Sequence, residues 1–229
     1  MHIKKTKEIT LNDLILISAL PDMGKVGGLV TEHLKKVLKC SQVAKIILQK
    51  PWVNQKKGII DNPTDEYYIF VNTDKKIAVF TGDGQPQEAS VVIELTSNLL
   101  KTIQEMGKIK MVISAGGYLP GKDDGDVFCV ATNQRTLDMA KSHGIKILDG
   151  QVNSITWFNG LILGHAKEKE IDGIGLFGKI EDSETPQYMA ASNVIKKIAQ
   201  ILDMKIDTAE LDEKIVKPVV EEKHSPGIG

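Results

Sequence analysis

The stretch LILISALPDMGKVGG, residues 14–28, decides the fold. Residues 14–20 form a short apolar run that Pro21 ends, which is typical of a buried strand. After a turn at residues 22–25, apolar side chains recur at three- and four-residue spacings from Val26 to Leu38, which predicts a helix. A strand, a tight turn and a helix in this order are typical of an α/β protein.

The alternation of strand and helix continues downstream. Further strands are predicted at residues 77–81, 110–115, 127–132, 145–148 and 173–177, and further helices at 88–107, 133–143, 152–169, 187–203 and 208–216. Because most of these strands are continuous apolar runs, the pattern predicts a twisted, mostly parallel sheet flanked by helices.

Residues 43–81 break this pattern. Short strands are predicted at residues 43–48, 66–71 and 77–81, with a hairpin turn at residues 73–75. This indicates an antiparallel insertion at one edge of the sheet. Residues 1–217 are predicted to form one domain, and residues 218–229 a flexible C-terminal tail.

Composition excludes several function classes. The 229 residues carry a net charge of −1, and Arg135 is the only arginine, so no nucleic-acid partner is expected. Cys40 and Cys129 lie far apart in apolar segments, which predicts free buried thiols and no disulfide framework. Neither a signal core nor a membrane-spanning run is seen, so no membrane partner and a cytoplasmic location are expected.

Glycine-rich and amide-rich loops gather where the predicted strands end. In open parallel sheets, ligands bind at this edge. Tight turns and close helix packing also explain these loops, and both readings stay open. The candidate pocket residues are Met23, Gly24, Asp83, Gln85, Gln87, Gly116, Gly117 and Asn153.

No catalytic set is identified. The nucleophile elbow GxSxG is absent, and the histidines form neither HxH nor HExxH, so no catalytic residue, metal site or cofactor is predicted. Asp83, Glu88 and Asp149 are the carboxylates available for acid–base chemistry. For Asp83 and Glu88, capping of the next helix is the favoured role.

The predicted helix at residues 152–169 is apolar on most sides. Such a helix is buried in the core or at a subunit interface. Trp157, Phe158 and Leu161 are therefore candidate interface residues.

Three stretches together resemble the PAC2 family, named after proteasome assembly chaperone 2. They are PDMG with VGG at residues 21–28, AGGY at 115–118, and GLILG at 160–164 followed by residues 171–176 and Thr185-Pro186. The resemblance implies a sheet similar to that of purine nucleoside phosphorylases. It also implies homo-oligomers or mixed complexes and a role in assembling or binding the proteasome core. Family members that dock on the proteasome end in a hydrophobic–Tyr–X motif, whereas this chain has Ile228 in place of the tyrosine.

Two hypotheses follow. The first is a non-catalytic assembly or scaffolding protein, a homo-oligomer whose partners are proteasome subunits or a related assembly factor. The second is a phosphorylase- or nucleosidase-like enzyme, or a small-ligand sensor, that uses the pocket at the strand ends. The lack of arginines that would hold phosphate argues against the phosphorylase version.

Overall fold

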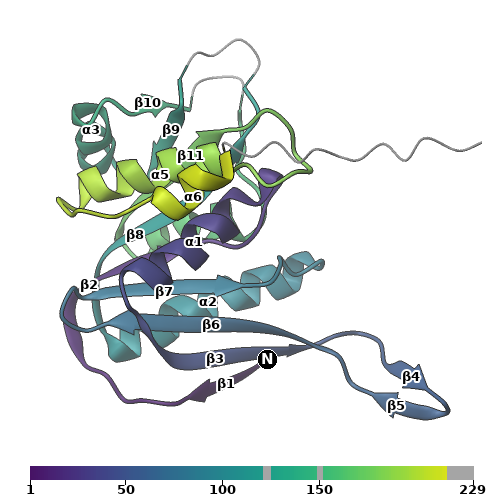
Figure 1. The fold of residues 1–229 in the computed structure, drawn as a ribbon. Coiled ribbons are helices and arrows are strands. Elements are labelled where there is room, and N and C mark those ends of the chain that lie inside the picture. The colour runs from purple at the N-terminus through teal and green to yellow at the C-terminus, as the bar shows by residue number, and fades with distance from the viewer. Residues whose placement is uncertain (121–124, 149–151, 216–229) are drawn as a thin grey trace, which may run out of the picture.

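A computed structural model of the chain describes residues 1–120, 125–148 and 152–215 (Figure 1). Within these residues, nine strands form one sheet in the order β1-β3-β6-β7-β2-β8-β11-β9-β10, and a separate hairpin pairs β4 with β5. The strands are β1 His2–Lys5, β2 Leu11–Ser18, β3 Ser41–Gln49, β4 Asn54–Lys56, β5 Ile59–Asp61, β6 Thr64–Asn72, β7 Ile77–Gly82, β8 Gly107–Tyr118, β9 Val127–Ala131, β10 Lys146–Ile147 and β11 Asp172–Lys179. The helices are α1 Val26–Val37, α2 Ala89–Met106, α3 Gln134–Ser142, α4 Trp157–Glu168, α5 Tyr188–Ile201 and α6 Ala209–Ile215, and a 3₁₀ turn, η1, spans Met23–Lys25.

The centre of the sheet is parallel, as the sequence predicts. Strands β7, β2, β8 and β11 run in the same direction. Successive side chains of β2 point to opposite faces, so Leu14 and Leu16 enter one core while Ile15 and Ile17 pack in the other. Burial on both faces explains why this strand is apolar from Leu14 to Ile17.

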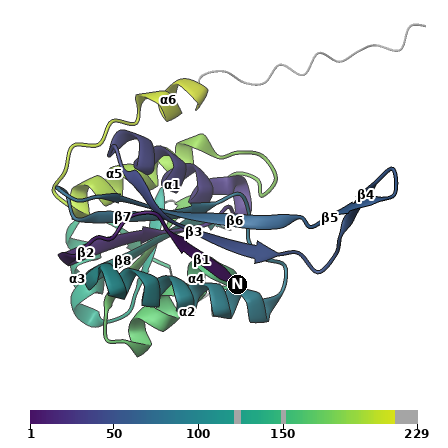
Figure 2. The ribbon, with the colours of Figure 1, turned by 90° about the horizontal axis from the view of Figure 1, so that it is seen from below.

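The helices divide between the two faces of the sheet. Helices α1 and α5 pack against each other on one face, and α2 and α4 pack against each other on the opposite face (Figure 2). The α/β class is therefore confirmed. None of the helices within the described residues combines the length and apolar character that a membrane crossing requires.

The predicted antiparallel insertion is confirmed at one edge. Strand β3 pairs antiparallel with β6, and β6 with β7. Strand β1, which the sequence analysis did not predict, extends this edge by pairing with β3.

A second difference lies between β3 and β6, where a loop was expected. Strands β4 and β5 form a hairpin that projects from the body of the molecule (Figures 1 and 2). Its two-residue turn has positive φ at both Lys57 (51°) and Gly58 (80°), as a type I′ turn requires. We refer to residues 52–61 as the arm.

The other edge of the sheet departs from the predicted parallel pattern. Strand β9 pairs antiparallel with β11 and parallel with β10. The connection from β8 to β9 spans only residues 119–126, which is too short for the crossover that a parallel strand needs. The chain therefore turns back, and the sheet is mixed: a parallel centre with antiparallel pairs on both sides.

Both cysteines are free, as predicted, but only Cys129 is buried and Cys40 is half-buried. Burial raises the pKa of each thiol to about 11. The predicted tail at residues 218–229 and the carboxylate Asp149 lie outside the described residues.

Candidate functional site

A cavity of about 480 Å³ opens where the central strands end. The turn after β2 contributes Asp22 and Met23, the end of β8 contributes Gly117, and the loop after β7 contributes Gln85. Val152 and residues 154–157, which precede and begin α4, close the remaining side. The predicted position of a ligand site, at the carboxyl ends of parallel strands, thus coincides with a cavity.

The wall formed by residues 152–157 exists because α4 begins later than the sequence predicts. A helix was expected from residue 152, but Thr156 is extended and Trp157 has φ of 58°, so regular helix starts only there. Close packing fixes this start, since a Cβ on Gly160 would lie 2.1 Å from the carbonyl oxygen of Ile155. Four of the five residues before the helix therefore line the cavity: Val152, Ser154, Ile155 and Thr156.

Asp22 lies at the base of the cavity and joins two elements. Its Oδ1 accepts a hydrogen bond from the backbone N–H of Gly27 at 2.9 Å, and its Oδ2 accepts one from Gly117 at 2.7 Å. The turn before α1 is thereby tied to the end of β8. This approach depends on glycine in β8, because a Cβ on Gly116 would lie 2.5 Å from Oδ2 of Asp22 and one on Gly117 would lie 2.3 Å from the carbonyl oxygen of Met23.

Asn159 and Gln85 fix the same turn from the other side. The buried Asn159 side chain accepts from the backbone N–H of Leu20 at 2.9 Å and donates to the carbonyl oxygen of Leu20 at 3.1 Å. Gln85 donates to the carbonyl oxygen of Pro21 at 3.1 Å and accepts from the backbone N–H of Phe158 at 3.1 Å. The start of α4 is therefore held against the end of β2 by side-chain amides.

Burial changes the protonation of Asp22. It raises the pKa of this carboxyl from 3.8 to about 7, although hydrogen bonds from Gly27, Gly117 and the Asn159 side chain favour the ionised form. A carboxyl with such a pKa changes charge near neutral pH. Perturbed carboxyls inside cavities are a common property of functional sites.

The structure brings some of the predicted pocket residues together and separates others. Met23, Gln85 and Gly117 line the cavity. Gly24 and Gly116 are buried beneath it, where they permit close packing. The remaining three predicted residues are exposed and outside the lining: Asp83, Gln87 and Asn153.

The capping role expected for Asp83 and Glu88 is not seen. Glu88 occupies the position before α2, but its side chain makes no capping hydrogen bond, and both carboxylates are exposed.

Sequence reasoning did not select Asp22 or Asn159. Asp22 is part of the stretch that decides the fold, where it counts only as a residue of the turn between strand and helix. Asn159 did have a signal in the sequence, since it is a single amide within an otherwise apolar run. A buried amide must find hydrogen-bond partners, so such a residue indicates a polar contact inside the fold.

The three candidate interface residues have different surroundings. Phe158 is fully buried and stacks on Phe80 with ring centroids 5.1 Å apart, so its side chain belongs to the core and not to the surface of the chain. Leu161 is half-buried against the same core. Trp157 is 44% exposed at the mouth of the cavity. Helix α4 is therefore apolar on the side that faces the sheet, and not on all sides.

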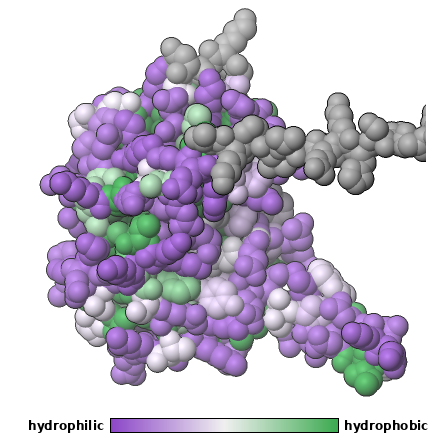
Figure 3. Space-filling model, viewed as in Figure 1, coloured by the Kyte–Doolittle hydropathy of each residue, from purple (hydrophilic) through white to green (hydrophobic). Residues whose placement is uncertain are grey.

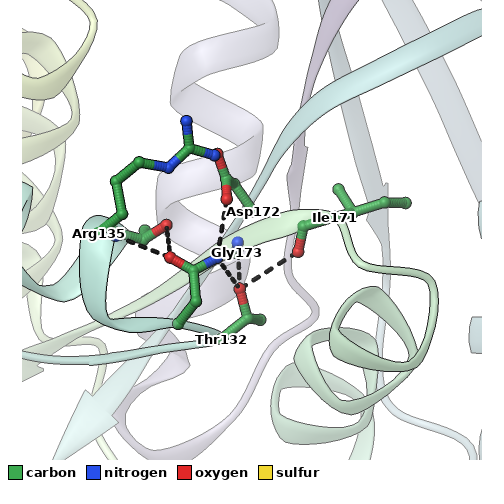
Figure 4. Close-up of polar contacts among 7 residues, drawn as sticks. Thr132, Arg135, Ile171, Asp172 and Gly173 are labelled. Atoms are coloured by element: carbon green, nitrogen blue, oxygen red, sulfur yellow. Dashed lines mark hydrogen bonds and ion pairs between the residues drawn. The ribbon is translucent and has the colours of Figure 1, made fainter.

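A separate polar network lies at the other end of the strands, at the start of β11 (Figure 4). Arg135 pairs with Asp172 at the start of β11, and Asp172 also accepts from Asn133 at 2.8 Å. Thr132 accepts from the backbone N–H of Gly173 at 2.8 Å and donates to the carbonyl oxygen of Ile171 at 3.2 Å. These contacts hold the start of α3 on β11, so the only arginine of the chain stands at the far end of the strands from the cavity.

The chain is similar in sequence and in fold to several known proteins. A model described as the PAC2 family matches residues 16–217. An uncharacterised protein of Methanocaldococcus jannaschii is 29% identical over 222 residues, which are 92% of this chain and 83% of that protein. PbaB of Pyrococcus furiosus, described as an archaeal proteasome activator, is 27% identical with a TM-score of 0.76 over 93% of both chains. PbaA of the same organism, described as an archaeal homolog of proteasome-assembly chaperone, is 20% identical with a TM-score of 0.75 over 93% of this chain and 92% of that one. At 20% identity this last likeness shows the fold alone.

Proposed function

The chain belongs to the PAC2 family, and from this premise we propose that it is a non-catalytic factor that assists the assembly of a proteasome. The observation that carries the proposal is the agreement in sequence and fold with PbaB along nearly the whole length of both chains. PbaA, which is described as a homolog of proteasome-assembly chaperone, shares the fold. We further propose that the protein acts in the cytoplasm as a homo-oligomer that binds proteasome subunits.

The arm supplies a surface suited to such a partner. Its exposed apolar side chains include Ile59 and Ile60, which are 74% and 66% exposed, together with Trp52 and Val53 (Figure 3). An isolated two-stranded hairpin is marginally stable in water, and exposed apolar patches mark interaction sites. A partner that covers these side chains would both stabilise the hairpin and bury its apolar surface.

The charge of the arm narrows the choice of partner. Lys56 and Lys57 outnumber the single carboxylate Asp61 within it. We propose that the arm docks into an apolar cleft with an acidic rim on a proteasome α-subunit, because opposite potentials guide association.

The first experiment measures absolute mass in solution, for the chain alone and after mixing with proteasome α-subunits of the same organism. A homo-oligomer that converts to a mixed complex is the expected result. A monomer that ignores the α-subunits would refute the assembly role.

The second experiment locates the contact with the double variant Ile59→Lys/Ile60→Lys. Since both side chains are exposed, the variant should fold normally, which a thermal melt checks. Affinity for the α-subunit should fall by at least roughly 30-fold if the two isoleucines lie at the centre of the interface. Ile93→Lys, at an exposed isoleucine of α2, is the matched control and should bind normally. Equal affinities of all three proteins would exclude the arm as the contact.

The phosphorylase version of the alternative gains no support from the structure. Arg135 is held by Asp172 at the opposite edge of the sheet, away from the cavity. The version that binds a small ligand does have a cavity to use, and it leads to a separate proposal.

A further inference from the structure

Asp22 is the one charged side chain among the described residues that line the cavity at the strand ends. The lining otherwise combines apolar walls with amide and hydroxyl groups. We propose that this cavity binds a small molecule with a flat apolar body and a cationic, N–H-donating head, and that the head pairs with Asp22. The proposal is independent of the assembly role and stands whether or not the chain binds a proteasome subunit.

The carboxylate has acceptor capacity left for such a head. Each of its oxygens accepts one backbone N–H, from Gly27 at 2.9 Å and from Gly117 at 2.7 Å. The Asn159 side chain also hydrogen-bonds to this carboxyl. An ionised carboxylate offers about four lone-pair directions, so about one remains for a ligand. A cationic N–H donor, such as an amidinium or a guanidinium, matches this charged acceptor.

The position of the carboxylate is fixed before any ligand arrives. Asn159 holds the backbone of Leu20 through two hydrogen bonds, and Gln85 holds that of Pro21. The turn that carries Asp22 is thus braced from α4 and from the loop after β7. A braced acceptor gives up little conformational freedom on binding, which favours affinity.

The walls suit an apolar body. Phe177 lines the inner part of the cavity, while Met23, Leu119 and Trp157 stand exposed around its mouth. Trp157 adopts φ of 58°, a conformation unfavourable for a bulky side chain, so the surrounding structure holds its backbone in this conformation. A volume of about 480 Å³ lies within the range of about 300–1,000 Å³ that is usual for small-molecule sites.

Three probes of the same shape test the charge preference: benzamidine, benzamide and benzoate. They share a phenyl body and carry a cationic, a neutral and an anionic head. At pH 8, benzamidine should bind with a Kd of about 1 mM or tighter, as expected for a ligand of this size. It should bind at least roughly tenfold more tightly than benzamide, because only the amidinium adds a positive charge to the hydrogen bond with the carboxylate, and benzoate should bind least. Chemical-shift titration of the chain measures all three affinities.

Two pairs of variants locate the site. Asp22→Asn removes the charge and should abolish the preference for benzamidine over benzamide. Asp83→Asn removes an exposed carboxylate from the same edge outside the cavity and should leave the preference intact. Should Asp22→Asn not fold, Ser154→Trp provides the test, since it places a large ring in the cavity from an exposed position. Asn153→Trp, at the exposed neighbour outside the lining, is its control.

Each possible outcome of these experiments either supports or overturns the proposed site. Cation preference that is lost in Asp22→Asn, or binding that is lost in Ser154→Trp, while the control variants keep both, supports the site. Equal affinity for benzamidine and benzamide, or no binding of benzamidine at millimolar concentration, overturns the proposal. Binding that persists unchanged in Asp22→Asn and Ser154→Trp also overturns it.

Discussion

Replacing Asp22 by asparagine isolates the effect of one carboxyl on the stability of the protein. In the wild type, burial raises the pKa of Asp22 to about 7, from 3.8 for a carboxyl in water. Between these two values the native state holds a proton that the unfolded chain releases. The free energy of unfolding therefore falls as the pH rises through this window. Below pH 3.8 and above pH 7 this group causes no further change with pH, so the loss persists above pH 7.

The size of the effect follows from the width of the window. It spans about 3 pH units, and each unit corresponds to about 1.36 kcal/mol, so the wild type loses up to about 4 kcal/mol from this carboxyl between pH 4 and pH 8. Asparagine does not titrate, and it accepts from only one of the two backbone N–H groups, which adds an offset that does not depend on pH. The stability of the wild type relative to Asp22→Asn should thus decrease by up to about 4 kcal/mol as the pH rises.

Urea unfolding of both proteins at intervals between pH 4 and pH 8 measures this difference. The exposed Asp83→Asn provides the control, for which the difference should remain nearly constant. A constant difference for Asp22→Asn would mean that burial does not raise the pKa of Asp22. A difference that increases with pH would mean that the hydrogen bonds from Gly27 and Gly117 outweigh burial and hold the carboxyl ionised.

Two further predictions concern packing. Gly27→Ala should destabilise the fold by about 2 kcal/mol or more, because its Cβ would lie 2.5 Å from the carbonyl oxygen of Leu20. The matched change Gly164→Ala lies inside α4, where a Cβ would meet nothing within 4 Å. It should stabilise the fold by about 0.5–1 kcal/mol, because alanine has the higher helix propensity. Equal effects of the two changes in urea unfolding would contradict the structure around α1. Phe158→Ala should cost about 3–5 kcal/mol, since this side chain is fully buried against Phe80; a loss below about 1 kcal/mol would show that Phe158 lies at the surface after all.

The centre of the fold could be predicted because its sequence signals are local. The second half of β2 is apolar on both faces, and α1 shows helical spacing, so each element is specified by a few consecutive residues. The antiparallel insertion was recognisable for the same reason, since β6 and β7 are short strands joined by a tight turn.

Features that depend on distant contacts could not be predicted in this way. The place of β9 in the sheet depends on its pairing with β11, some 40 residues further on, and not on its own apolar residues. The late start of α4 depends on Gln85, which binds its first turn from another loop. In contrast, the arm had a local signal. Lys57-Gly58 stands between a short polar and a short apolar run, as in a hairpin turn, but the segment was predicted as a loop.

The candidate site illustrates the same division. Its location followed from topology alone, because parallel strands deliver their following loops to one edge. Its chemistry did not follow from topology. The raised pKa of Asp22 depends on burial, and its contact with β8 depends on the close approach that the glycines of β8 allow; both arise only after folding. Exposed polar residues of the same loops, such as Asp83 and Asn153, are indistinguishable from it in the sequence.

The two proposals rest on different parts of the molecule and can be tested separately. The arm extends from the insertion between β3 and β6, whereas the cavity lies at the ends of β2, β8 and β11. A change at Ile59 therefore leaves the lining of the cavity intact, and a change at Asp22 leaves the arm intact. If a ligand in the cavity altered the affinity for a proteasome subunit, coupling would have to pass through β7 and β2, which pair directly and connect the insertion to the parallel centre. Linkage requires such coupling to be reciprocal, so the subunit would then change the affinity for benzamidine by the same factor. Measuring the affinity for benzamidine with and without the α-subunit thus decides whether the chain carries two independent sites or one regulated assembly factor.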